Sequence, residues 1–266
     1  MATLPKPPLE KPGRSPANRS LARGVELLRA FRPGTEVLGN TELSERTGLS
    51  PATVTRLTQT LVRAGLLQRA GHSRAYRLAP AVLSLAHAMR SGCSELTVAA
   101  PIMREVAQKH FINVGLAAPD RDEMVYLESI RHSQKVELRK VVSGQRVPME
   151  LTSLGRAYLA IAPAQQRTAL LTLFRRRRGV QWPAIQREID AAISQIQALG
   201  WCAASWLPGV IAVAAPLRHC TLPLVLNVST SNSDSPDQTL RQLVPILMDT
   251  IARVDQQMQT FRFTAD

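Results

Sequence analysis

Apolar and polar residues in the first third of the chain alternate with the period of short α-helices. Residues 20–32 gather their apolar side chains on one face behind Ser20, which we expect to cap a first helix. Residues 40–47 predict a second, shorter helix with Leu43 as its apolar anchor. In residues 50–65 the apolar positions again share one face. The pattern therefore predicts three short helices in succession.

The turn between the second and third predicted helices carries the local signals of a helix-turn-helix motif. Gly48 permits a left-handed turn, Ser50 can cap the third helix, and Pro51 suits a first helical position, where no N–H is needed. The apolar stripe of this helix is Val54, Leu57, Leu61 and Val62. An exposed polar helix of this kind fits the major groove of DNA. The residues that we expect to contact DNA are Ser50, Ala52, Thr53, Thr55, Arg56 and Gln59.

A β-hairpin is predicted directly after the third helix. Residues 66–69 and 75–78 read as two short strands joined by a basic tip. This hairpin would be the wing of a winged helix-turn-helix, and Arg69 and Arg74 would contact phosphates or the minor groove. Residues 80–91 predict a further helix that connects to the rest of the chain.

From about residue 95 the pattern changes to a mixture of helices and strands. Six strands are predicted at 112–118, 124–130, 135–142, 201–206, 210–216 and 222–230. Helices are predicted at 95–110, 153–161, 163–174, 183–199 and 236–257. The arginine run Arg175–Arg178 reads as a solvated loop. The order of elements predicts an α+β domain with an antiparallel sheet and flanking helices.

The pattern divides the chain into four parts, and the N-terminal third is the most basic region. These are a disordered basic arm at 1–19, a winged helix-turn-helix at 20–79, a helical linker at 80–94 and a second domain at 95–260. Residues 1–90 carry 14 lysine and arginine residues against five acidic residues, whereas residues 91–266 carry 19 against 15. Localised positive charge favours binding to nucleic acid, although a generally basic surface is the simpler alternative.

Residue spacing gives no support for an enzyme or a metalloprotein. The three cysteines are far apart, and none of the five histidines stands at metal-ligand spacing. The sequence contains neither a nucleophile elbow nor a phosphate-binding loop. We therefore expect no catalytic residue, no metal and no cofactor. No apolar run approaches the roughly 18–20 residues that span a membrane, so we also expect a cytoplasmic protein without a membrane partner.

A candidate ligand pocket is suggested by one predicted strand of the second domain. In residues 224–229, alternation places Asn227 and Ser229 on the face opposite the core. Ala212 and Ala214 share one face of the preceding strand. Small residues with a few hydrogen-bonding groups suit a small polar ligand. The alternative, that Asn227 and Ser229 simply face water, stays open at this stage.

Motifs in both domains resemble the IclR-type transcriptional regulators. In the first domain they are LARGVELLRAF and LSERTGLSPATVTRLTQTLVRAGLL; in the second they are VVSGQRVPMELTSLGRAYLA, LGWCAASWLPGVIAVAAPL and LVLNVSTS. The resemblance implies a winged helix, a helical linker and a sensor domain similar to the GAF fold. It also implies homodimers or homotetramers on palindromic double-stranded operator DNA.

The resemblance further implies an effector, usually a small organic acid or an aromatic catabolite. The residues that it places around the effector are Thr152, Ser153, Leu154, Ala204, Ser205, Ala212, Asn227 and Ser229. The chain departs from the family pattern at Asn227, where a serine is frequent, and at Thr55, where many members have histidine. Two hypotheses remain: a DNA-binding regulator controlled by an organic or aromatic acid, or an effector-independent dimeric DNA-binding protein whose second domain only oligomerises.

Overall fold

Three helices and a small antiparallel sheet make up the described part of the first unit of the chain, Met1–Leu85. The computed structural model describes residues 18–71, 74–131, 142–231 and 235–263. The strand order of the small sheet is β1-β3-β2. The bounds are Arg19–Arg29 for α1, Leu38–Gly39 for β1, Asn40–Thr47 for α2, Pro51–Arg63 for α3, Leu67–Arg69 for β2 and Ala75–Leu78 for β3. This arrangement is the predicted winged helix-turn-helix, with β1 as an additional strand.

Local signals build the turn between α2 and α3 as predicted. Gly48 has a φ of 68°, and the Ser50 side chain accepts a hydrogen bond from the Thr53 amide at 3.4 Å. The cap of α1 differs from the prediction, because Asn18 rather than Ser20 accepts from the Leu21 amide, at 3.0 Å. An asparagine oxygen caps a helix as well as a serine hydroxyl does, so the helix begins earlier than predicted.

Helix α4, Ala81–Ser91, connects the first unit to the second and contains no buried residue. The division between the units falls inside it, between Leu85 and Ala86. Its larger apolar side chains Leu83, Leu85 and Met89 are 75%, 62% and 51% exposed. Leu85 and Met89, which are one helical turn apart, form an exposed apolar side, and such a side indicates a surface for another molecule.

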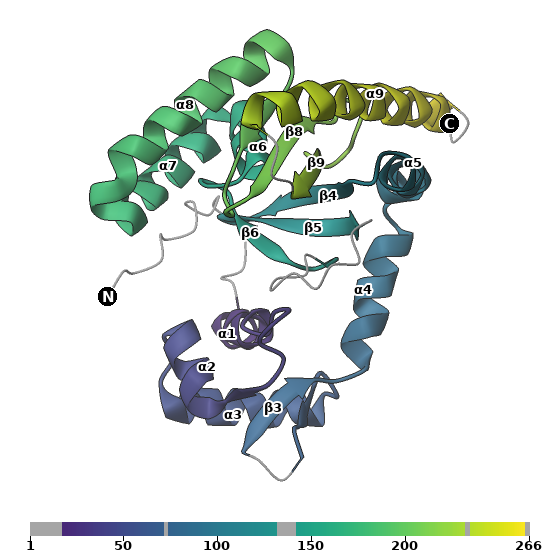
Figure 1. Cartoon of the computed structure of the whole chain (residues 1–266). Helices are drawn as coiled ribbons and strands as arrows, with labels where there is room; N and C mark the ends of the chain where they lie inside the picture. The colour runs from purple at the N-terminus through teal and green to yellow at the C-terminus, as the bar shows by residue number, and fades with distance from the viewer. Residues whose placement is uncertain (1–17, 72–73, 132–141, 232–234, 264–266) are drawn as a thin grey trace, which may run out of the picture. The chain divides into compact units, whose positions relative to one another are not determined.

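The second unit, Ala86–Asp266, is organised by a six-stranded antiparallel sheet of order β6-β5-β4-β9-β8-β7 (Figure 1). The strands are β4 Asn113–Asp120, β5 Glu123–Ile130, β6 Arg146–Pro148, β7 Cys202–Ala204, β8 Val210–Pro216 and β9 Val225–Ser231. The helices are α5 Ser94–His110, α6 Ser153–Ile161, α7 Ala164–Arg178, α8 Trp182–Leu199 and α9 Pro236–Phe263, with a short 3-10 turn, η1 Gly179–Gln181, before α8. The predicted α+β fold class is thus confirmed.

The two faces of this sheet carry separate cores. On one face, Leu116 and Leu226 pack in a cluster with residues of α5 and α9. On the other, Ala117 and Val225 pack with residues of α6, α7 and α8. The alternation along β4 and β9 therefore divides the side chains between two layers of helices.

The third predicted strand, 135–142, falls almost entirely outside the described residues. In the described residues, the six-stranded sheet is completed by a different strand, β6, Arg146–Pro148, which pairs with β5. The sequence did not predict it, because a three-residue strand that ends in proline shows no measurable alternation. None of the helices in these ranges is both long enough and apolar enough to cross a membrane.

The prediction of a loop at Arg175–Arg178 is wrong, because these residues form the last turns of α7. Arg177 pairs with Asp122, and Arg178 donates from Nε and Nη2 to Oε1 of Glu150 at 2.9 and 2.7 Å. Cations also suit a helix C-terminus, where the helix dipole is negative. The side chain of Glu150 is completely buried, and Arg178 replaces water at Oε1, whereas Oε2 accepts no hydrogen bond from the described residues.

We predict that Arg178→Ala lowers the free energy of unfolding of the second unit by about 3 kcal/mol, because it leaves the buried Glu150 carboxylate without its main partner. Trp182, Trp201 and Trp206 all lie in the second unit, so urea unfolding followed by tryptophan fluorescence reports on that unit. Arg175→Ala is the control, since Arg175 is exposed, and it should change stability by less than about 0.5 kcal/mol. Equal losses in both variants would contradict the prediction.

Candidate DNA-binding surface and ligand pocket

Helix α3 presents the predicted DNA-contacting residues on its outer side. Ser50, Ala52, Thr55, Arg56 and Gln59 are exposed, and Thr53 is half-buried. The opposite side buries Val54, Leu57 and Leu61 as predicted, together with Thr58. The Thr58 hydroxyl donates to the Val54 carbonyl at 2.9 Å, which explains how a polar residue is accommodated in this core.

The exposed hydroxyls of α3 are partly engaged within the first unit. The Thr55 hydroxyl donates to the Pro51 carbonyl at 2.9 Å and accepts from the Asn40 amide nitrogen at 3.1 Å. Asn40 is the first residue of α2, so this contact fixes α2 against α3. The methyl group of Thr55 is consequently the part best able to contact a base, whereas no hydrogen bond or ion pair to a described residue holds the Arg56 guanidinium. Arg56 is therefore the side chain of α3 that is best suited to read an exposed base edge.

The wing residues Arg69 and Arg74 are both exposed. Arg69 ends β2, and Arg74 directly precedes β3. The two residues at the tip, His72 and Ser73, lie outside the described residues. The structure therefore places two cations beside the tip of the hairpin, where phosphate contacts by a wing are expected.

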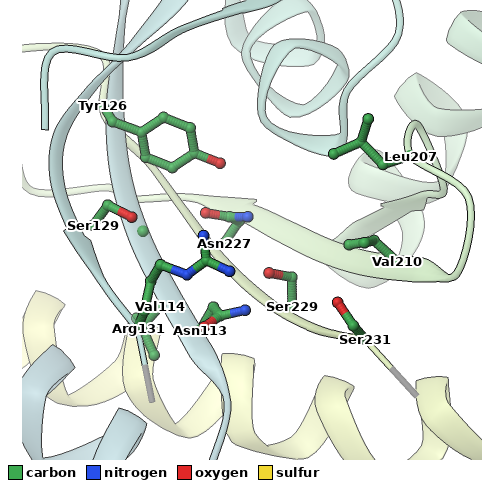
Figure 2. A pocket seen from close by; sticks show the side chains of 11 residues that line it. Asn113, Val114, Tyr126, Ser129, Arg131, Leu207, Val210, Asn227, Ser229 and Ser231 are labelled. Carbon is green, nitrogen blue, oxygen red and sulfur yellow. The ribbon is translucent and has the colours of Figure 1, made fainter. Parts of the chain in front are cut away.

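In the second unit, a pocket opens on the sheet face that also packs against α6. It is open to solvent, and its cavity volume is about 60 Å³. β4, β5, β8, β9 and the loop before β8 contribute its walls (Figure 2). The lining residues are Asn113, Val114, Gly115, Tyr126, Ser129, Arg131, Leu207, Val210, Asn227, Ser229 and Ser231.

Strand register brings the polar residues of the pocket together. Asn113 lies opposite Ser229, and Gly115 lies between Asn227 on β9 and Ser129 on β5. A Cβ atom at Gly115 would lie 2.5 Å from Oδ1 of Asn227 and 2.4 Å from a ring carbon of Tyr126. Glycine is thus required for the Asn227 and Tyr126 side chains to meet above β4.

The pocket combines hydrogen-bond acceptors, a donor and a cation. The Oδ1 atoms of Asn113 and Asn227 are buried and accept no hydrogen bond from the described residues. Burial raises the pKa of Tyr126 to about 12, so its phenol stays protonated and can donate. Figure 2 shows the Tyr126 oxygen directed towards Asn227, and the Arg131 guanidinium reaching the same amide from the other side. Buried acceptors without partners call for a ligand that supplies hydroxyl or amine donors.

Two of the eight residues that we expected around the effector, Asn227 and Ser229, line this pocket. Asn227 is only 5% exposed, so the alternative that it faces water is wrong. Ala212, on β8, lies opposite Ser229, on β9; it is next to the pocket but does not line it. Ala204 pairs with Ala212 on the far side of β8 from the pocket. Ser205 does not line the pocket; its hydroxyl donates to the Val210 carbonyl at 2.9 Å across the loop that carries Leu207.

The other three expected residues, Thr152, Ser153 and Leu154, are buried at the start of α6. The Thr152 hydroxyl accepts from the Gly155 amide at 3.2 Å and donates to the Pro148 carbonyl at 2.8 Å. This segment therefore caps α6 and does not line the pocket.

Five polar lining residues were not predicted from the sequence. Ser231 ends β9, and the other four are Asn113, Tyr126, Ser129 and Arg131. These four come from the β4–β5 hairpin. A prediction that paired this hairpin with β9 in the correct register would have placed Asn113 beside Ser229. In the ranges that the structure describes, no group of three or more His, Cys, Asp or Glu side chains is arranged to hold a metal ion.

Comparison with protein families gives two matches that together span more than half of the chain. The family model for the IclR helix-turn-helix domain matches residues 20–71. The model described as bacterial transcriptional regulator IclR C-terminal matches residues 93–256. The two matches follow the same order as the two units of the structure.

Curated relatives align over most of the chain. The HTH-type transcriptional regulator TsaQ1/TsaQ2 of Comamonas testosteroni is 30% identical over 252 residues, which cover 91% of this chain and 89% of the relative. The Pca regulon regulatory protein of Pseudomonas putida is 28% identical over 241 residues, covering 86% and 80% respectively.

Solved structures share the fold. An IclR family transcriptional regulator from Brucella abortus has a TM-score of 0.80 and 34% identity, over 91% of this chain and 93% of its own. An IclR homologue from Microbacterium hydrocarbonoxydans, complexed with 4-hydroxybenzoate, has a TM-score of 0.67 and 21% identity, over 91% and 99%. At that identity the second likeness shows the fold alone.

We predict that Arg56→Ala weakens binding to a specific DNA site by about 1–3 kcal/mol, because it removes a base contact from α3. Fluorescence anisotropy on a fragment that the wild-type protein selects from genomic DNA would measure this loss at fixed salt. Arg175→Ala, which removes the same charge from the second unit, should leave the affinity within twofold. An unchanged affinity in the Arg56 variant would exclude Arg56 as a base-reading residue.

Proposed function

The chain belongs to the IclR family of bacterial transcriptional regulators, and on this basis we propose that a small organic or aromatic acid, bound in the pocket of the second unit, controls its binding to operator DNA. The family is one of transcriptional regulators rather than enzymes. Specific DNA contacts come from Ser50, Ala52, Thr53, Thr55, Arg56 and Gln59, with Arg69 and Arg74 of the wing on the phosphates. The net positive charge of residues 1–90 supports this assignment.

The pair of unpartnered amide oxygens in the pocket carries the proposal of an effector. The Oδ1 atoms of Asn113 and Asn227 are buried without a hydrogen bond from any residue in the described ranges, which is costly unless a ligand or water supplies donors. Arg131 lies in the same pocket and suits a carboxylate. A compound with both a hydroxyl and a carboxylate satisfies the two requirements together. Aromatic hydroxy acids are therefore the first ligands to test, and the 4-hydroxybenzoate complex of the Microbacterium hydrocarbonoxydans homologue supports this choice.

We further propose that two copies of the chain associate through α4 and read a palindromic operator in the cytoplasm. Leu85 and Met89 are four residues apart, so they share one side of α4, and both are exposed. Leu83 and Arg90 are seven residues apart, which is about two helical turns, so they share the other side of α4. A two-fold dimer presents its recognition helices to two symmetric half-sites.

The effector is tested by thermal unfolding, followed by tryptophan fluorescence, with 4-hydroxybenzoate. A ligand at about 100 times its Kd stabilises the protein by about 2.7 kcal/mol. Arg131→Met should weaken this binding at least about tenfold, because it removes a charged hydrogen-bond donor. Arg175→Met is the matched control and should bind as the wild type does.

The competing hypothesis makes a different prediction for the same experiment. If the second unit only oligomerises, no hydroxylated acid stabilises the protein, although selection of genomic fragments still yields a sharp palindromic motif. That pair of results would replace the effector proposal by an effector-independent regulator. Selection of DNA without any motif would contradict specific operator binding itself.

We predict that Leu85→Glu shifts the dimer towards monomer by at least tenfold in dissociation constant, because a charge would have to be buried in the proposed interface. Sedimentation velocity over a concentration series measures the change. Leu83→Glu, on the Arg90 side of the same helix, should leave the assembly unchanged. Dissociation in the second variant and not the first would place the interface on the wrong side of α4.

A further inference from the structure

The last turn of α4 is attached to strand β5 by one arginine. Arg90 donates to the Leu127 carbonyl and forms an ion pair with Oε2 of Glu128 at 2.7 Å. All three residues belong to the second unit. Because α4 is otherwise without buried residues, this contact is the principal described link between the helix and the sheet.

The contact is made at a β-bulge. Along the β4–β5 pair, Leu116 lies opposite Glu128, but Ala117 lies opposite Tyr126, so Leu127 has no partner in the ladder. A bulged residue leaves its backbone groups unpaired and bends the strand. Arg90 donates to the carbonyl of this bulged residue.

The bulge also divides neighbouring residues between the two faces of the sheet. Tyr126 and Ser129 line the pocket. Leu127 packs in the opposite core, and Glu128 is on the same face because it lies opposite Leu116, a member of that core. Arg90 therefore contacts this segment of β5 on the sheet face opposite the one that lines the pocket.

A second set of hydrogen bonds ties the same segment to the chain that follows. Oε1 of Glu128 accepts from the Ser143 hydroxyl at 3.0 Å and from the Ser129 amide at 3.0 Å. The Tyr126 backbone accepts from the Gly144 amide at 2.7 Å and donates to the Gln145 carbonyl at 3.0 Å. Burial alone would raise the pKa of Glu128, but the hydrogen bonds from Arg90, the Ser129 amide and Ser143 outweigh it and lower the pKa. The carboxylate thus stays charged and joined to Arg90 at neutral pH.

We propose that the Arg90–Glu128 pair couples occupancy of the pocket to the linker helix α4. The inference rests on the proposed function, since it assumes an effector in this pocket. A ligand that contacts Tyr126 and Ser129 shifts the preferred position of the bulge. Arg90 contacts the two adjacent residues Leu127 and Glu128, so α4 shifts with the bulge. Because α4 continues without interruption into the first unit, its position affects how the recognition helices are presented. Arg90 and Glu128 are positioning residues, and neither lines the pocket.

The test compares operator affinity with and without saturating 4-hydroxybenzoate in the full-length protein. Glu128→Gln keeps the size of the side chain but removes its charge. Arg90→Lys keeps the charge, but an ammonium lacks the planar guanidinium that binds the Leu127 carbonyl and the Glu128 carboxylate together. The matched control is the Arg253–Glu105 pair between α9 and α5, which has an Arg–Glu distance of 2.6 Å and lies away from the pocket, tested as Arg253→Lys and Glu105→Gln.

We expect the wild type and both control variants to change operator affinity at least fivefold on adding the ligand. In Glu128→Gln and Arg90→Lys this change should fall below twofold, while operator affinity without ligand stays within threefold of the wild type. Thermal shift should still detect 4-hydroxybenzoate in both variants. That separation of ligand binding from its effect on DNA is what a merely structural ion pair would not produce.

Two other outcomes overturn the inference in distinguishable ways. If the variants bind the ligand and retain the full change in operator affinity, coupling does not pass through Arg90 and Glu128, and the proposed function stands. If the wild type itself neither binds 4-hydroxybenzoate nor responds to it, the proposal of an aromatic acid effector fails, and the inference falls with it.

Discussion

The antiparallel pairing of β4 with β9 is the constraint on which the second unit depends. It places Leu116 beside Leu226 on one face and Gly115 beside Asn227 on the other. Shifting the register of β9 by one residue would place the Asn227 amide in an apolar core and a leucine in the pocket. The packing of the two cores therefore specifies the register. The missing side chain of Gly115 then leaves the space that Tyr126 and Asn227 share.

How far the sequence predicts the structure depends on the range of the interactions. Gly48, Ser50 and Pro51 act on their immediate neighbours, and the helix-turn-helix that they predict is present. The end of α7 depends on Glu150, 28 residues before Arg178, and a local pattern cannot show that partner. The same limit applies to the pocket. Alternation within one strand identified Asn227, whereas Asn113 requires the pairing of strands that are more than 100 residues apart.

Arginine serves three different physical purposes in this chain, although the net charge counts all arginines alike. Arg178 satisfies a buried carboxylate and stabilises the fold. Arg90 joins a helix to an irregular point of a strand. Arg56 is exposed without a described partner and keeps its hydrogen-bonding capacity for another molecule. Long guanidinium side chains with fixed geometry suit all three purposes.

The absence of buried residues in α4 has a consequence for the mechanical properties of the link between the units. A helix of 11 residues with no buried residue gains little from tertiary packing beyond the contacts of Arg90, and it is only marginally stable in water, because nucleation is costly and the segment is short. Its rigidity must therefore come largely from whatever covers its apolar side. If two copies associate through α4 as proposed, covering that side would stiffen the helix, and assembly would give the chain a more rigid connection between its units.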